Sequence, residues 1–215
     1  MTGGTEPLPA TSAAVPPAAP AVPAAVPRVV PLHNAANLLT ALRLVLVPVF
    51  VVFTIASGME SDGWRMAACL AFGVASLTDF VDGWIARRYG LVTAFGKVAD
   101  PIADKALTGT ALVLLSAYGE LPWWVTVVIL ARELGVTVLR FFFLRYGVIA
   151  ASRGGKVKTA LLILAIAWYL WPFPDPIAAI GPWIMAAAVV VTVATGLDYA
   201  VRALRLRRKA APDER

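Results

Sequence analysis

Residues 78–105 read TDFVDGWIARRYGLVTAFGKVADPIADK and contain four aspartates between two strongly apolar segments. The flanking segments, LAFGVASL before and ALTGTALVLL after, have the composition of hydrocarbon-facing helices. An ionisable side chain at membrane depth costs at least about 2.5–3.5 kcal/mol. The carboxylates of Asp79, Asp82, Asp100 and Asp104 therefore need a partner that offsets this cost, and a divalent cation is the natural partner for clustered carboxylates.

The composition indicates a polytopic membrane protein. The chain has 215 residues, of which 60% are hydrophobic and only 15% are charged, whereas a soluble domain of this size rarely carries so little charge. Its single cysteine, Cys69, excludes a disulfide framework and a cysteine-based zinc site, and its single histidine, His33, excludes a histidine-rich metal site. The net charge of +6 comes from basic residues at predicted helix ends, so we expect no nucleic-acid partner.

Three regions differ in composition. Residues 1–30 are rich in alanine and proline and almost uncharged, which predicts a disordered tail without the basic and apolar regions of a signal peptide. Residues 31–205 form the predicted transmembrane domain, which carries the candidate catalytic site. Residues 206–215 form a basic tail.

The predicted fold is all-α, with six transmembrane helices. Each apolar segment approaches the roughly 20 residues that a bilayer requires, and glycine or proline separates it from the next. The expected spans are residues 37–57, 65–88, 100–118, 122–145, 156–171 and 177–204. We expect Pro101 at the first position of the third helix, so one alternative to a metal-binding role is that Asp100 merely caps this helix.

The distribution of basic residues predicts the orientation. With a cytoplasmic N-terminus, one side of the membrane receives nearly all lysines and arginines, and the other receives mainly acidic residues with Arg65. This asymmetry places both termini in the cytoplasm, and all four aspartates at or just below the cytoplasmic surface of the plasma (inner) membrane.

Helical spacing brings the carboxylates together. Asp79 and Asp82 are three residues apart on one helix face, which they share with the small residues Gly83 and Ala86. Asp100 and Asp104 are four residues apart on the next helix, and a short loop over residues 88–99 would make the two helices antiparallel. An ordinary ion pair between the first two aspartates and Arg87 or Arg88 is an alternative.

Oxygen ligands without histidine or cysteine favour hard cations, namely Mg²⁺, Mn²⁺ or Ca²⁺. Four carboxylates could hold two such ions, and two ions could clamp a diphosphate during a phosphoryl transfer. One carboxylate could instead act as a general base.

The same stretch resembles the CDP-alcohol phosphatidyltransferase family, whose pattern is D-x2-D-G-x2-A-R-x8-G-x3-D-x3-D. Every spacing is met by eight residues: Asp79, Asp82, Gly83, Ala86, Arg87, Gly96, Asp100 and Asp104. The resemblance extends from about Asn37 to Lys158 and implies a six-helix membrane fold. It also implies transfer of the phosphatidyl group of CDP-diacylglycerol to an alcohol, with release of CMP, by a homodimeric enzyme that uses two Mg²⁺ or Mn²⁺ ions.

The resemblance assigns roles within the site. Asp79, Asp82 and Asp100 would bind the two ions, and Asp104 would lie near one ion and act as the base. The residues expected to bind CDP-diacylglycerol are Gly83, Ala86, Arg87, Thr93, Asn37 and Thr40.

A second charged cluster bears on the acceptor alcohol. Arginines inside a membrane helix are expensive and indicate an acidic or phosphate partner. The candidate acceptor-phosphate residues are Arg132, Arg140, Lys156 and Lys158. Arg132 could instead pair with Glu133 or the aspartates, and Arg140 could merely extend its charge to the interface.

Four further segments resemble the branch of the family that uses glycerol 3-phosphate. They are NLLTALRL from Asn37, PIADK from Pro101, ARELGVTVLR from Ala131 and GKVKT from Gly155. A sister enzyme with another acceptor, such as inositol phosphate, serine or a lipid alcohol, shares the aspartates. A cation transporter or a prenyl transferase also places acids in membrane helices, although the aspartate-rich patterns of prenyl transferases are absent from this sequence.

Overall fold

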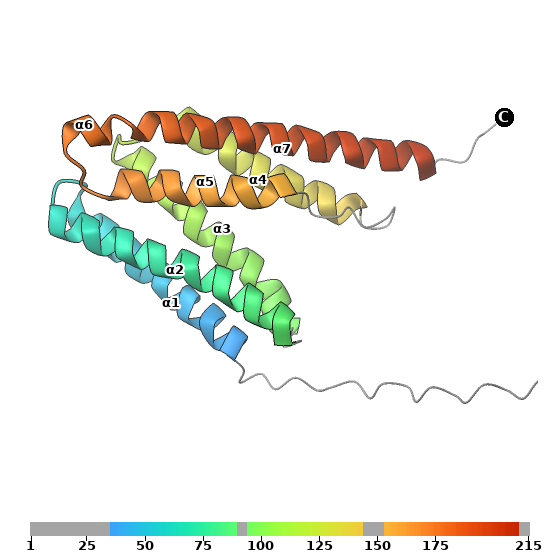
Figure 1. Ribbon diagram of the computed structural model, residues 1–215, viewed down its shortest axis with the longest axis horizontal. Helices are drawn as coiled ribbons and strands as arrows, with labels where there is room; N and C mark the ends of the chain where they lie inside the picture. Colours follow the sequence, from blue (N-terminus) through green and yellow to red (C-terminus); the bar gives the residue numbers. More distant parts are fainter. Residues whose placement is uncertain (1–34, 90–93, 144–152, 211–215) are drawn as a thin grey trace, which may run out of the picture.

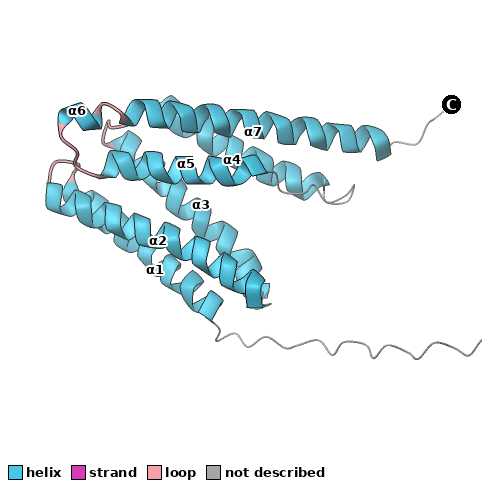
Figure 2. Cartoon of the chain, viewed as in Figure 1, coloured by secondary structure: helices cyan, strands magenta, loops and turns pink. Residues whose placement is uncertain are grey.

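The computed structural model describes residues 35–89, 94–143 and 153–210 (Figure 1). All regular structure in these ranges is helical, which confirms the predicted all-α class (Figure 2). Six helices are long, and α6 is a single turn. The bounds are α1 Ala35–Ser57, α2 Asp62–Tyr89, α3 Ala94–Ala117, α4 Trp123–Phe143, α5 Arg153–Leu170, α6 Asp175–Ala178 and α7 Gly181–Ala210.

The helices form one bundle with two parts, the α1–α2 pair and the group of α4, α5 and α7. Helix α3 contacts both parts, and α5 also contacts α2. Helix α1 packs along α2, and both α4 and α5 pack along α7. The α1–α2 turn and α6 lie at the same end of the molecule, at the left in Figure 1. The C-terminal end of α2, which carries Asp79 and Asp82, lies at the other end.

An apolar core holds the bundle together. Phe50 of α1 and Phe72 of α2 are completely buried, with ring centroids 5.7 Å apart. Leu112 of α3, Ile129 of α4 and Ile166 of α5 are also completely buried in the same cluster. In lipid such side chains gain close van der Waals contacts with one another, and these contacts hold the helices together and fix how they cross.

Large apolar side chains also cover the outside. Phe80 and Trp84 of α2 are 71% and 53% exposed, and Trp183 of α7 is 78% exposed. Three segments in the described part of the chain are long and apolar enough to cross a membrane: Leu38–Ser57, Asp62–Ile85 and Asp175–Arg205. A chain with such spans and an apolar exterior is a membrane protein.

The predicted start of the third helix was wrong. Helix α3 begins at Ala94, so Asp100 and Pro101 lie inside it, and residues 94–99 are helix instead of loop. Asp100 is therefore not a helix cap. A proline removes one backbone hydrogen bond, and membrane helices tolerate this because neighbouring groups satisfy the freed carbonyl.

The other predicted helices match the structure with small shifts at their ends. The sixth predicted span is divided, since α6 precedes α7. Helix α7 continues to Ala210, beyond the point where the basic tail was predicted to start. The predicted disordered N-terminal tail lies outside the described residues.

Candidate active site

Near its C-terminal end, helix α2 turns its acids toward the bundle and Phe80 and Trp84 outward. Asp82 is 2% exposed, whereas the neighbouring Phe80 and Trp84 are mostly exposed. Asp79 is half-buried and lies on the same face as Asp82, as their spacing of three residues predicts. Ionisable residues of membrane helices usually face the bundle interior, where partners can offset their cost.

Arg43 of α1 is the partner of both acids. Its Nη1 lies 2.6 Å from Oδ1 of Asp79, and its Nη2 contacts Oδ2 of Asp82. The Arg43 side chain is completely buried, and its Nε has no hydrogen-bond partner in the described part of the chain. Arg43 had no predicted role in the site, although an arginine inside an apolar segment was a signal for one.

Thr40 joins the acids of α2 to those of α3. Its hydroxyl donates to Oδ1 of Asp100 over 2.8 Å and lies 3.5 Å from Oδ2 of Asp82. Thr40 is buried, one helical turn before Arg43. Two side chains of α1 thus contact three of the four predicted aspartates, although sequence spacing places none of these residues near α1.

The donor atoms of this region are of the chemical kind that a hard divalent cation prefers, although the described ones are not grouped around one point. In the part of the chain that the structure describes, no three acidic, histidine or cysteine side chains are grouped closely enough to hold a metal ion. The guanidinium of Arg43 lies between Asp79 and Asp82 and supplies the positive charge there. The surrounding donors are carboxylate and hydroxyl oxygens, which Mg²⁺ and Mn²⁺ prefer. Metal binding by the aspartates stays a prediction.

A cavity of about 540 Å³ connects the two predicted clusters. It is lined by residues of α2, α3, α4, α5 and α7. Its charged lining residues are Asp79, Asp100, Asp104, Lys105, Arg132, Glu133 and Lys158. Acids that could bind a metal ion and cations that could bind a phosphate therefore line one cavity.

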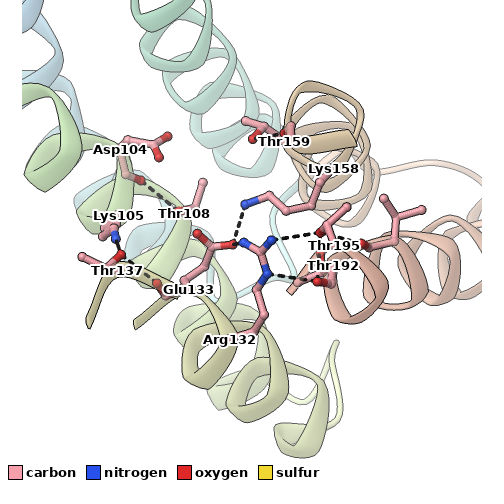
Figure 3. Close-up of polar contacts among 12 residues, drawn as sticks. Asp104, Lys105, Thr108, Arg132, Glu133, Thr137, Lys158, Thr159, Thr192 and Thr195 are labelled. Atoms are coloured by element: carbon pink, nitrogen blue, oxygen red, sulfur yellow. Dashed lines mark hydrogen bonds and ion pairs between the residues drawn. The ribbon is translucent and has the colours of Figure 1, made fainter. Parts of the chain in front are cut away.

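Arg132, Glu133 and Lys158 form a network on one wall of the cavity (Figure 3). Oε1 of Glu133 accepts from Nη1 of Arg132 over 3.0 Å and also from Nζ of Lys158. The alternative in which Arg132 pairs with Glu133 is thus seen in the structure. Lys156 is exposed and is not among the described residues that line the cavity.

Lys105 lines the same cavity and was missing from the predicted site. Its Nζ donates to the hydroxyl of Thr137 on α4, and that hydroxyl donates to the carbonyl oxygen of Glu133 over 2.8 Å (Figure 3). The signal in the sequence was its position directly after Asp104. Lys105 was predicted only as part of the PIADK motif.

The residues predicted to bind CDP-diacylglycerol are only partly described. Gly83 is half-buried on the inner face of α2, beside Asp82. Thr93 lies outside the described residues, as do the side chains of Asn37, Ala86 and Arg87. The side chain of Arg140, a predicted acceptor residue, lies outside them too.

A family model described as CDP-alcohol phosphatidyltransferase matches residues 33–194, which include all four aspartates and both lysines of the cavity. The chain belongs to the CDP-alcohol phosphatidyltransferase family. Members of this family are generally metal-dependent.

Individual members of the family are also similar to this chain. A probable phosphatidylglycerophosphate synthase of Mycobacterium tuberculosis is 52% identical over 172 residues, covering 80% of this chain and 82% of that protein. A CDP-diacylglycerol–glycerol-3-phosphate 3-phosphatidyltransferase of Bacillus subtilis is 38% identical over 184 residues, covering 78% and 94%. The enzyme of the same name from Escherichia coli is 37% identical over 172 residues, covering 77% and 92%.

Proposed function

We propose that this protein transfers the phosphatidyl group of CDP-diacylglycerol to the primary hydroxyl of sn-glycerol 3-phosphate, giving phosphatidylglycerophosphate and CMP. The observation that carries the proposal is the single cavity in which Asp79, Asp100 and Asp104 face Lys105 and Lys158. A lipid diphosphate needs the acids, which could hold metal ions, and a phosphorylated alcohol needs the lysines, which could bind its phosphate. The names of the similar proteins support this choice of donor and acceptor.

The aspartates would hold the metal. Asp79, Asp82, Asp100 and Asp104 supply the oxygen ligands for two Mg²⁺ or Mn²⁺ ions. When bound, such ions neutralise the carboxylates and the donor diphosphate and stabilise the charge that develops on the leaving oxygen. Gly83, which has no side chain, leaves room beside Asp82 for the donor, and Ala86, Arg87, Thr93, Asn37 and Thr40 complete the predicted donor site.

Asp104 is the proposed general base. Its carboxylate takes the proton of the primary hydroxyl as that oxygen forms a bond to the lipid-side phosphorus. The bond between this phosphorus and the oxygen of CMP breaks, and CMP leaves with the electron pair. The base lies on α3 one helical turn after Asp100, so the two carboxylates share one face of the helix.

The lysines that line the cavity determine the choice of acceptor. Lys158 and Lys105 line the cavity and can neutralise a phosphate, so we propose that they bind the phosphate of glycerol 3-phosphate. Inositol phosphate also carries a phosphate, whereas serine does not. The predicted contributions of Arg140 and Lys156 to binding the acceptor phosphate remain part of the proposal.

The proposed setting is the plasma (inner) membrane. Six helices span it, both termini and the cavity face the cytoplasm, and the acyl chains of the donor remain in the lipid. The excess of basic residues on one side supports this orientation. Two copies of the chain form the proposed homodimer.

An acceptor panel tests the function. Purified protein in detergent receives labelled CDP-diacylglycerol, Mg²⁺ or Mn²⁺, and in turn glycerol 3-phosphate, inositol phosphate, serine or glycerol. We expect CMP release and a labelled lipid product with glycerol 3-phosphate only, and loss of the reaction after chelation. Incorporation of inositol phosphate without glycerol 3-phosphate would overturn the acceptor and favour the sister enzyme.

A further inference from the structure

The guanidinium of Arg132 is held by the protein through all three of its nitrogens. Its Nε donates to the carbonyl oxygen of Thr192 over 3.0 Å, its Nη1 to Oε1 of Glu133 over 3.0 Å, and its Nη2 to Oγ1 of Thr195 over 2.9 Å. Each of its three nitrogens therefore has a partner, two of them on α7 (Figure 3). These bonds fix the orientation of the guanidinium against α7, and leave one further N–H on each of Nη1 and Nη2.

Glu133 links Arg132 to Lys158. The same atom, Oε1, accepts from both cations, so the carboxylate lies between α4 and α5 (Figure 3). Lys158 is 8% exposed, and an ammonium has three donors, of which the contact with Glu133 uses one. Without Arg132, Glu133 would have one cation fewer to fix its rotamer and would hold Lys158 less firmly.

Gly196 of α7 makes this arrangement possible. A Cβ atom at Gly196 would lie 2.9 Å from Cγ and 3.0 Å from Nε of Arg132. Real Cβ atoms essentially never come that close to another heavy atom, so one of the two groups would have to move. Cγ is near the root of the Arg132 side chain, and three hydrogen bonds hold the other end, so the side chain could not yield without losing partners.

We propose that Arg132 is a positioning residue for the acceptor site. It acts through Glu133 to fix Lys158 on the cavity wall, and Gly196 provides the space through which Arg132 reaches its partners on α7. Lys158, with Lys105 on the facing helix α3, contacts the phosphate of the acceptor. This inference rests on the proposed function and assigns Arg132 a role behind the phosphate-binding residues.

The first test is Gly196→Ala, with Gly135→Ala as its matched control. Gly135 lies on α4, and a Cβ atom there would meet nothing within 4 Å. KM for glycerol 3-phosphate and KM for CDP-diacylglycerol are measured separately. We expect Gly196→Ala to raise KM for glycerol 3-phosphate by about tenfold, because a charge-assisted contact to its phosphate is weakened. KM for CDP-diacylglycerol should change little. Gly135→Ala should behave like the wild-type protein.

A double-mutant cycle then shows whether Gly196 acts through Arg132. Arg132→Ala removes the atoms that a new Cβ would strike, so Gly196→Ala should have little further effect on KM in that background. Thr195→Val removes the hydroxyl that accepts from Arg132 and tests the same link if Gly196→Ala does not fold. It should also raise KM for glycerol 3-phosphate selectively.

Two results for KM, and one for the double-mutant cycle, would overturn the inference. One is an unchanged KM for glycerol 3-phosphate in the variants of α7, and the other is an equal rise in KM for both substrates, which marks a purely structural role. Additive effects in the cycle would also overturn it. Failure of the wild-type protein to use glycerol 3-phosphate would instead overturn the proposed function, so the two failures are distinguishable.

Discussion

Arg43 and Asp82 form an ion pair in which both side chains are almost completely buried, at 0% and 3% exposed. The same guanidinium reaches Asp79, whose side chain is 41% exposed. Taking two charges out of water is expensive, and only close contact between them repays the cost. Arg43 thus stabilises, from α1, a pair of carboxylates that α2 alone could not keep in an apolar bundle.

Removing this arginine should destabilise the protein strongly. Arg43→Gln leaves the carboxylate of Asp82 buried without its cation, and loss of one partner of a buried pair costs about 3–5 kcal/mol. Thermal and denaturant unfolding in detergent measure the change. Mn²⁺ should restore part of the lost stability, because a cation bound at the carboxylates replaces the missing charge.

The matched control is Arg202→Gln. Arg202 pairs with Asp198 on α7 at 3.0 Å, but these side chains are 53% and 48% exposed. An exposed pair of this kind contributes about 0–1 kcal/mol. Equal destabilisation by the two substitutions would contradict the role given to Arg43.

Thr40→Val tests the link between the two acid helices. The substitution keeps the shape of the side chain and removes the donor to Asp100, so that this carboxylate is less well oriented. Outer-shell partners of metal ligands typically contribute about 10–100-fold to metal affinity. We therefore expect weaker Mn²⁺ binding within that range, measured by electron paramagnetic resonance of the free ion.

Thr54→Val is the control for that measurement. Thr54 is also completely buried on α1, but its hydroxyl donates to the carbonyl oxygen of Phe50 within the same helix. Its replacement should leave Mn²⁺ affinity unchanged. A similar loss of affinity in both variants would indicate a general effect of α1 packing.

The sequence predicted those parts of the site that depend on helical spacing. Asp79 and Asp82 share a buried face because they are three residues apart, and Asp100 and Asp104 share the cavity because they are four apart. The helices themselves followed from apolar length and from glycine and proline breaks. Such local rules need no knowledge of the tertiary contacts.

Contacts between distant segments were not predictable in this way. Arg87 and Arg88 were possible partners of the acids because they are close in the chain, whereas Arg43 lies 39 residues before Asp82. Arg132 is hydrogen-bonded to Thr192 and Thr195, which lie 60 and 63 residues later in the chain. No periodicity indicates which helices will be neighbours, so these partners required the structure.

Arg65 should contribute to stability without affecting the substrates. It donates to the carbonyl oxygens of Met59, Tyr169 and Leu170 at 3.2, 2.9 and 3.4 Å, and so ties the α1–α2 turn to the end of α5. Arg65→Met leaves these acceptors without a donor and should cost about 1–3 kcal/mol.

Unfolding in detergent measures the loss at Arg65, and KM for both substrates should remain unchanged because the acids lie near the other end of α2. Arg65→Lys keeps the charge but reaches fewer acceptors, so its stability should lie between those of Arg65→Met and the wild-type protein. A selective change in KM would contradict a purely structural role.

Asp104→Asn tests the proposed base. The amide keeps the size of the side chain but cannot take the proton of the acceptor hydroxyl, and loss of a general base lowers the rate by about 10²–10⁴-fold. CMP release should fall by that amount, while metal-dependent binding of CDP-diacylglycerol is largely kept. Asp198→Asn changes an exposed carboxylate on α7 and should leave CMP release unchanged. Near-full activity of Asp104→Asn would show that another group takes the proton, and parallel loss of donor binding and turnover would assign Asp104 to the metal alone.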